Sequence, residues 1–203
     1  MISLRLSAAL SVMSAVALIL SACSTESENV KASPSQAARR SESQQSFVQM
    51  ATVLRHPRCI NCHPATDYPR QGMEGRRHAQ LVMRGPNNHG APALQCATCH
   101  QTSNQDDRVP GAPHWGLAPI TMAWDGLDDH DLAEALKDRL KNGNRSLEAL
   151  HDHMANDALV AWAWNPGGSR EKPPISHDDF ARLVKLWIET GAVSPDKPRS
   201  VSN

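Results

Sequence analysis

The sequence predicts an all-α fold with long loops, on the strength of three observations. The C-terminal half carries apolar residues at helical spacing, no segment shows the period-two alternation of a strand, and 14 Pro and 11 Gly indicate extended irregular stretches. The clearest helical face follows the i, i+3, i+4, i+7, i+8 rule and consists of Phe180, Leu183, Val184, Trp187 and Ile188. Ser176 and Asp179 before this stripe resemble a capping box, and Gly191 ends it.

Two more helices are predicted before this one, which makes three in the C-terminal half. Asp128 or Asp129 is suited to cap the first, which is expected to stop at Gly143. Its apolar face is Leu132, Leu136 and Leu140. Ser146 is suited to cap the second, whose face contains Leu147, Leu150, His151 and Met154. Apolar residues continue from 158 to 164 and end at Asn165-Pro166-Gly167-Gly168. A short helix is also predicted over 46–54, from Phe47, Met50, Ala51 and Leu54.

The remaining chain is rich in Pro and Gly. Segments 64–95 and 101–125 are expected to be loops, with at most a helical turn or two over 77–83. Loops of this length within a compact domain need something to fold around. The chain is 40% hydrophobic, and part of that content lies at the extreme N-terminus. Side chains alone therefore make a thin core, and a bound group is expected to fill the interior.

The N-terminus has the features of an export signal. Arg5 is followed by an uncharged apolar run over 6–20, which at about 1.5 Å per residue is shorter than a bilayer core of about 30 Å. Leu20-Ser21-Ala22-Cys23 resembles the bacterial lipoprotein box, in which the Cys is lipidated and the chain is cut before it. Ser24, where an Asp would indicate the inner membrane, favours the outer membrane. The alternative is an ordinary signal peptide with a chance Cys.

These features divide the chain into four parts. Residues 1–22 are the predicted signal peptide, and 23–45, rich in Ser, Glu and Gln without apolar periodicity, are predicted to be a flexible tether. Residues 46–195 form the predicted domain, and 196–203 a tail.

The other four cysteines form two copies of one motif, Cys59-Ile60-Asn61-Cys62-His63 and Cys96-Ala97-Thr98-Cys99-His100. Cys-x-x-Cys-His is the attachment site of a c-type haem. Two thiols spaced by two residues in a helical turn can form thioethers with one edge of a porphyrin. The His that follows then supplies the axial ligand to the iron.

Two other readings of the cysteines are open. Four Cys could hold one zinc ion, or each pair could be a redox dithiol. Neither needs a His directly after each pair, and His is only ten of the 203 residues. We therefore expect two covalent haems. The five tryptophans are candidate walls for them: Trp115, Trp124, Trp162, Trp164 and Trp187.

From His56 to Trp187 the chain resembles a family of small bacterial dihaem c-type cytochromes, often labelled the cytochrome subunit of isoquinoline 1-oxidoreductase-like enzymes. Beside the haem motifs, the matching words are His56-Pro57-Arg58, Arg84-Gly85-Pro86, Pro110-Gly111-Ala112-Pro113-His114-Trp115, Leu117-Ala118-Pro119, Met122-Ala123-Trp124 and Trp162-Ala163-Trp164. The resemblance implies a periplasmic electron acceptor for a molybdenum-containing hydroxylase.

His63 and His100 are the expected fifth iron ligands, and the sixth positions are open. His78, between the motifs, and Met122, after a Pro as in many monohaem cytochromes, are the first choices. His114, His151 and His153 remain candidates, and His89, Met73 and Met83 are weaker ones. For each candidate His, the alternative is an uncoordinated, hydrogen-bonded core residue.

Electron transfer is the predicted function. With 21 basic and 21 acidic residues, the chain has no electrostatic reason to bind nucleic acid. A dihaem enzyme such as a peroxidase, with one open iron position, is the alternative, and a ligand sensor comes third. The expected partners are a redox protein and, through Cys23, a membrane on the periplasmic side.

Overall fold

The computed structural model describes residues 34–198. The predicted signal peptide, Cys23, and residues 199–203 of the predicted tail lie outside the described residues. Within them the protein is mostly helical, as predicted. Its helices are α1 (Gln36–Leu54), α2 (Pro57–Ile60), α3 (Asp129–Lys137), α4 (Leu147–Asn156), α5 (Ala158–Ala161) and α6 (His177–Glu189). None of these helices is both long and apolar enough to cross a membrane.

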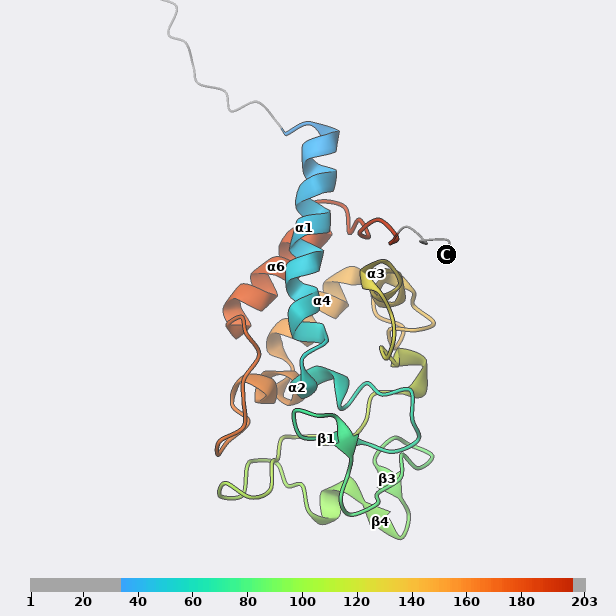
Figure 1. Ribbon diagram of the computed structural model, residues 1–203, viewed down its shortest axis with the longest axis vertical. Helices are drawn as coiled ribbons and strands as arrows, with labels where there is room; N and C mark the ends of the chain where they lie inside the picture. The colour runs from blue at the N-terminus through green and yellow to red at the C-terminus, as the bar shows by residue number, and fades with distance from the viewer. Residues whose placement is uncertain (1–33, 199–203) are drawn as a thin grey trace, which may run out of the picture. The chain divides into compact units, whose positions relative to one another are not determined.

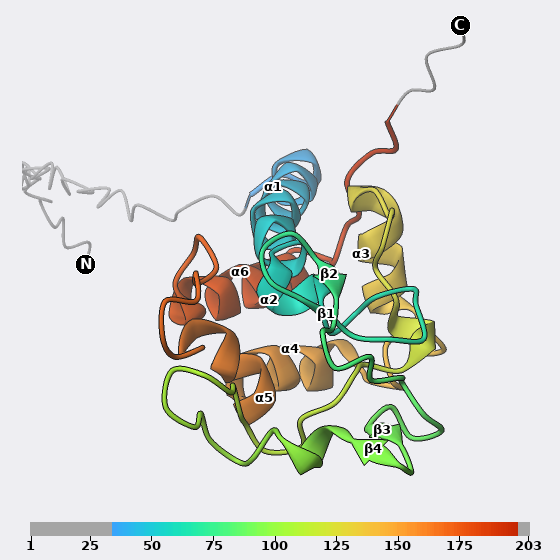
Figure 2. The same cartoon turned by 60° about the horizontal axis from the view of Figure 1, so that its bottom comes forward.

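Between α2 and α3 the chain is mainly loop. It contains two antiparallel pairs of two-residue strands, β1 (Arg70–Gln71) with β2 (Arg76–Arg77) and β3 (Gly90–Ala91) with β4 (Leu94–Gln95). Three 3₁₀ turns complete the structure: η1 (Cys96–Thr98), η2 (Ile120–Met122) and η3 (Trp162–Trp164). Figure 1 shows the longer helices gathered at one end and the hairpins at the other. Figure 2 shows the β1–β2 hairpin beside α2, where the Arg70 amide donates to the Asn61 carbonyl.

The hydrophobic core lies between α1, α3, α4 and α6. Its fully buried side chains include Phe47, Met50, Leu132, Leu136, Leu150, Phe180, Val184 and Trp187. Phe47 and Trp187 pack ring against ring, with their centroids 5.2 Å apart. The predicted faces at 46–54 and 180–188 thus meet each other. The caps Asp128, Ser146 and Ser176 also act as predicted, each accepting a hydrogen bond from the amide three residues later.

The domain begins earlier than predicted, because α1 starts at Gln36 rather than near Ser46. The tether prediction is therefore wrong for 36–45. The missed part of the buried face is polar: Ser43 is fully buried, donates to the Trp187 carbonyl and accepts from the Val193 amide. A serine face of this kind leaves no apolar periodicity. The domain also extends past 195, since Asp196 pairs with Arg40 and Lys197 with Asp131.

One local prediction is also wrong. The helix that begins after Asp128 ends at Lys137, because the Asp138 carboxylate accepts from the Leu140 amide and turns the chain. Leu140 is consequently 86% exposed. No helical turn forms over 77–83, where Arg76–Arg77 pairs as a strand and Leu81 has a φ of 55°.

Replacing Ser43 by Ala tests the revised N-terminal boundary. The change leaves the Val193 amide without its partner, so we expect a loss of about 1–2 kcal/mol in the free energy of unfolding. Ser41→Ala is the matched control: it lies on the exposed side of the same helix and should change stability by less than about 0.5 kcal/mol. Denaturant unfolding measures both. If Ser43→Ala changed the free energy of unfolding as little as Ser41→Ala does, residues 36–45 would act as a tether.

Candidate functional site

The first Cys-x-x-Cys-His motif sits on a single helical turn. Pro57 opens α2, whose N-cap is His56, and Cys59 lies in its last turn. The amides of Cys62 and His63 both donate to the Cys59 carbonyl, at 3.0 and 3.2 Å. Cys59, Cys62 and His63 are therefore held close together on half-buried positions. Both sulfurs are free thiols.

The loop from Leu117 to Asp125, which contains η2, supports this motif from one side. The Ala118 amide donates to the Cys62 carbonyl at 2.9 Å, and the Trp124 amide to the His63 carbonyl at 3.0 Å. The Trp124 ring stacks on the His63 imidazole, with centroids 3.5 Å apart and planes 11° from parallel. Asp125 fixes the end of the loop through a bidentate pair with Arg70 and a hydrogen bond from the Ala65 amide.

The His63 ring is oriented by a backbone group of the same loop. Its Nδ1 lies 2.9 Å from the Met122 carbonyl oxygen, which only accepts, so Nδ1 carries the proton and donates. The Nε2 lone pair is then free for a metal. A histidine held through Nδ1 to a carbonyl is the usual arrangement of a metal-ligating imidazole.

The second motif repeats this arrangement with different residues. Its cysteines lie at the start and C-cap of η1, and the His100 amide donates to the Cys96 carbonyl at 2.9 Å. Nδ1 of His100 donates to the Pro110 carbonyl at 2.7 Å, and the Trp115 ring stacks on the imidazole at 4.5 Å and 7°. Gly111, the residue after Pro110, packs closely against the Ser103 carbonyl, and a Cβ at this position would clash with that carbonyl.

Both motif histidines are neutral at pH 7. Burial lowers the pKa of His63 to about 4, against the opposing effect of the Met122 carbonyl. Burial also lowers the pKa of His100, and the Pro110 carbonyl again opposes it. A neutral imidazole is the form that binds a metal.

The thiols of the first motif are poorly suited to thiolate chemistry. Burial, then the neighbouring Cys62, raises the pKa of Cys59 to about 12 despite nearby Arg58. Burial and Cys96 raise the pKa of Cys62 to about 11. A reactive dithiol needs the opposite shift in pKa. Over residues 34–198, no three His, Cys, Asp or Glu side chains gather as a preformed metal site.

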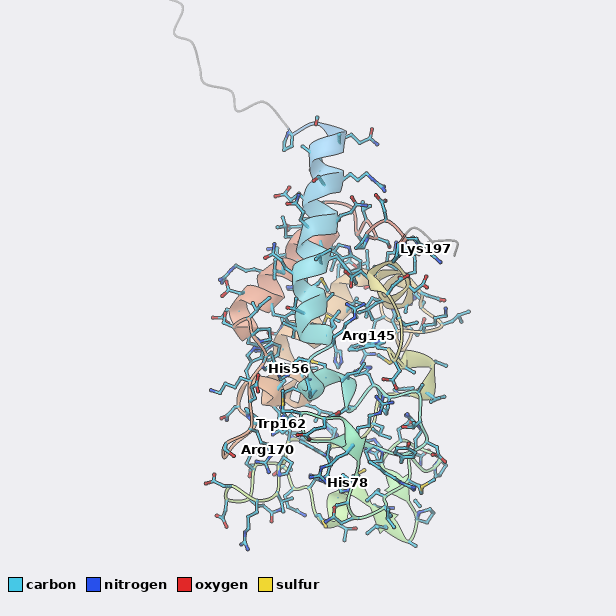
Figure 3. The ribbon with its side chains drawn as sticks, in the orientation of Figure 1. His56, His78, Arg145, Trp162, Arg170 and Lys197 are labelled. Carbon is cyan, nitrogen blue, oxygen red and sulfur yellow. The ribbon has the colours of Figure 1, made fainter. Side chains whose placement is uncertain are left out.

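A cavity of about 480 Å³ lies between the two motifs, within the size range of cofactor sites. Cys62 of the first motif and Cys96, Cys99 and His100 of the second line it. Five arginines also line it and none of its lining residues is acidic: Arg58, Arg70, Arg76, Arg108 and Arg170. Figure 3 shows Arg170, Trp162 and His78 below α2, toward the hairpins. An apolar space with a cationic border suits a flat group that carries carboxylates, as haem does.

His78, a predicted sixth ligand, faces His100 across this cavity. The ring centroids are 6.0 Å apart and the planes meet at 70°. Nδ1 of His78 accepts weakly from the Gln80 amide, at 3.4 Å. The rings of His78 and His100 therefore lie close together in the lining of the cavity.

Met122, the other predicted sixth ligand, contacts the first motif through its backbone. Its own carbonyl binds Nδ1 of His63, whereas the iron would bind Nε2 on the far edge of the ring. The buried Met122 Sδ lies instead near Gly143.

The five tryptophans divide into two groups. Trp115 and Trp124 support the motif histidines, and Trp162 lines the cavity and meets Trp115 edge-on at 4.7 Å. Trp187 belongs to the helical core, of which Trp124 is also a member, and Trp164 stacks on His177 and packs against Phe180.

Arg84 holds loops of the site together, a role that the sequence analysis did not predict. It is buried, and its guanidinium donates to the carbonyls of Pro64, Thr66 and Ala118. No carboxylate pairs with it among the described residues. It ties the chain after His63 to the loop that carries Trp124. Only its place in a Pro/Gly-rich segment hinted at this, because an arginine that binds carbonyls has no sequence signature.

Comparisons of the chain with protein-family models, with curated proteins and with solved structures find no match. The functional argument therefore depends on the geometry of the two motifs.

Proposed function

We propose that this chain is a c-type cytochrome that carries two covalent haems and transfers electrons. Cys59 and Cys62 would bind one haem, and Cys96 and Cys99 the other, with His63 and His100 as the fifth iron ligands. One observation carries the proposal: each motif histidine donates through Nδ1 to a backbone carbonyl and stacks on a tryptophan from a separate loop. Because different residues orient both motif histidines in the same way, we propose the same role for both motifs.

When bound, each haem iron takes up or releases one electron. The chain's own residues fix the geometry and the surroundings of that exchange. The Met122 and Pro110 carbonyls hold the imidazoles in one tautomer and raise their basicity. Trp115 and Trp124 exclude water from one face of each imidazole, and the arginines around the cavity would compensate the haem carboxylates. The fold this implies is a helical domain whose long loops wrap the haems.

The proposal includes a location and partners. The signal peptide and Cys23 would export the chain and anchor it by lipid on the periplasmic side, with the outer membrane favoured. The donor would be a partner oxidoreductase, of which a molybdenum-containing hydroxylase is the candidate from the family resemblance. Neither the membrane anchoring nor the transfer of electrons requires nucleic acid or catalysis by this chain.

Haem staining of a denaturing gel and intact mass test the proposal. We expect a stained band and a mass above the mature polypeptide by two haem groups, because both attachments are covalent. The double variant Cys96→Ala/Cys99→Ala should keep one haem group, the one attached to Cys59 and Cys62. Zinc without covalent haem in the purified wild type would contradict the proposal.

The ferric spectrum separates electron transfer from the enzyme alternative. With both irons six-coordinate, we expect two low-spin haems and no peroxide turnover. A persistent high-spin haem together with peroxide turnover would instead favour a dihaem peroxidase. The position of His78 opposite His100 favours the first result.

A further inference from the structure

Segment 76–83 forms part of the wall of the cavity between the two motifs. Alternate residues of this segment line the cavity: Arg76, His78, Gln80 and Val82. Three of the residues between and after them do not line the cavity and are exposed: Arg77, Leu81 and Met83. The segment thus presents one side to the cavity and the other to solvent. We call Arg77, Leu81 and Met83 its outer face.

Hydrogen bonds hold this segment against the neighbouring chain. The His78 amide donates to the Pro69 carbonyl at 3.0 Å, and the Ala79 amide donates to the Gln71 side chain at 2.9 Å. The Leu81 amide donates to the His78 carbonyl at 3.0 Å, which closes a turn. The backbone that carries the outer face is therefore fixed on both sides of that turn.

Leu81 is held in a conformation that does not suit a leucine. Its φ is 55°, in the left-handed region that residues with bulky side chains rarely adopt, and 65% of the residue is exposed. Single exposed apolar side chains are common on protein surfaces. A leucine that is both strained and exposed is different, because Gly or Asn would suit the backbone and the solvent better. Such strain points to a function, and contact with another molecule would use this side chain.

The chain around Leu81 is basic. The next acidic residue after Glu74 is Asp106, whereas Arg76 and Arg77 between them are both exposed. Neither of these arginines forms an ion pair in the described part of the chain. An acidic surface on a partner would therefore be complementary to this region.

The Arg77 side chain lies beside an apolar part of the outer face. Its guanidinium carbon is 4.5 Å from the centre of the Tyr68 ring, and its Nη2 is 3.4 Å from Sδ of Met83. Met83 is itself 37% exposed. Arginine and methionine are both enriched in protein–protein interfaces, whose centres are apolar and whose rims are polar. The outer face has this composition.

We infer that the outer face of segment 76–83 is the docking site for a redox protein with an acidic surface. The inference rests on the proposed function, since it takes the cavity behind the segment to hold a haem. Segment 76–83 alone would then separate the docked partner from that haem. Leu81 and Met83 would provide the apolar contact, and Arg76 and Arg77 would steer the partner to it.

Electron transfer from a reduced plant-type [2Fe–2S] ferredoxin, an acidic redox protein, to the ferric holoprotein tests the inference. We expect the rate to fall as salt is added, because opposite charges bring the two proteins together. Arg77→Gln should slow the transfer several-fold at low salt and weaken its dependence on salt. Arg182→Gln is the matched control, since it removes the same charge from the exposed surface of α6 and should leave the rate unchanged.

Leu81→Asn separates docking from folding. Asparagine adopts the left-handed region more readily than leucine, so the variant should be at least as stable as the wild type in denaturant unfolding. Transfer from the ferredoxin should nevertheless slow several-fold, because the apolar contact is lost. Leu140→Asn, at a position that is 86% exposed between α3 and α4, is the control and should leave the rate unchanged.

The contrary outcomes are distinct. Unchanged transfer rates in Arg77→Gln and Leu81→Asn would overturn the inference and leave the two-haem proposal intact. The inference would also be wrong if these variants kept the wild-type rate and lost only binding to phosphatidylglycerol vesicles, since the surface would then bind lipid. Absence of covalent haem from the wild type would instead refute the proposed function itself.

Discussion

Trp187→Ala is expected to lower the free energy of unfolding by about 3–5 kcal/mol, the range for truncating a large aromatic core residue. Trp187 is fully buried, contacts Phe47 across the α1–α6 interface, and donates through Nε1 to the Val193 carbonyl. The variant therefore loses apolar contacts and leaves a carbonyl short of a donor. Denaturant unfolding of the holoprotein measures the loss.

Trp187→Ala also tests whether Trp187 is a core residue or lines a haem site. Because Trp187 belongs to the helical core and not to the cavity lining, the visible and paramagnetic spectra of both haems should stay unchanged. Trp115→Ala is the contrasting control, since its ring stacks on His100 and should perturb the second haem. A shifted haem spectrum in Trp187→Ala would mean that this residue is a wall after all.

The helical elements were predictable where burial is apolar. The stripe at 180–188 and the caps Asp128, Ser146 and Ser176 specify their helices locally, and the structure forms them there. Prediction failed where burial is polar or where a side chain redirects the chain. The first half of α1 buries Ser43, and Asp138 stops α3 one turn early. Neither effect leaves a trace in hydrophobic periodicity.

The candidate site also has a part that the sequence predicts and a part that it does not. The attachment residues follow from their spacing, because the chemistry requires Cys, Cys and His within one helical turn. The groups that orient the histidines could not be predicted, since the acceptors are the backbone carbonyls of Met122 and Pro110. Met122 illustrates the limit. The prediction concerned the side chain of Met122, whereas the group that contacts His63 is the backbone carbonyl of Met122.

The two haem motifs should differ in their effect on stability. Cys59 and Ile60 pack against the core formed by α1, α3, α4 and α6, whereas no residue of the second motif belongs to that core or packs on it. Cys99 is exposed, and η1 lies among the loops. Under the proposed function, loss of the first haem would therefore disturb the helical core, whereas loss of the second would loosen mainly the loops around the cavity.

We therefore expect Cys59→Ala/Cys62→Ala to be less stable than Cys96→Ala/Cys99→Ala by on the order of 3 kcal/mol, the cost of emptying one large site in a core. In a domain of this size that corresponds to a melting temperature lower by roughly 10 °C. Each variant loses two thiols and one haem, so each is the matched control for the other. Helical circular dichroism followed against temperature measures the difference. Equal melting temperatures would show that the loops and the helices unfold as one unit held together by both haems, because the first motif would then have no privileged contact with the core.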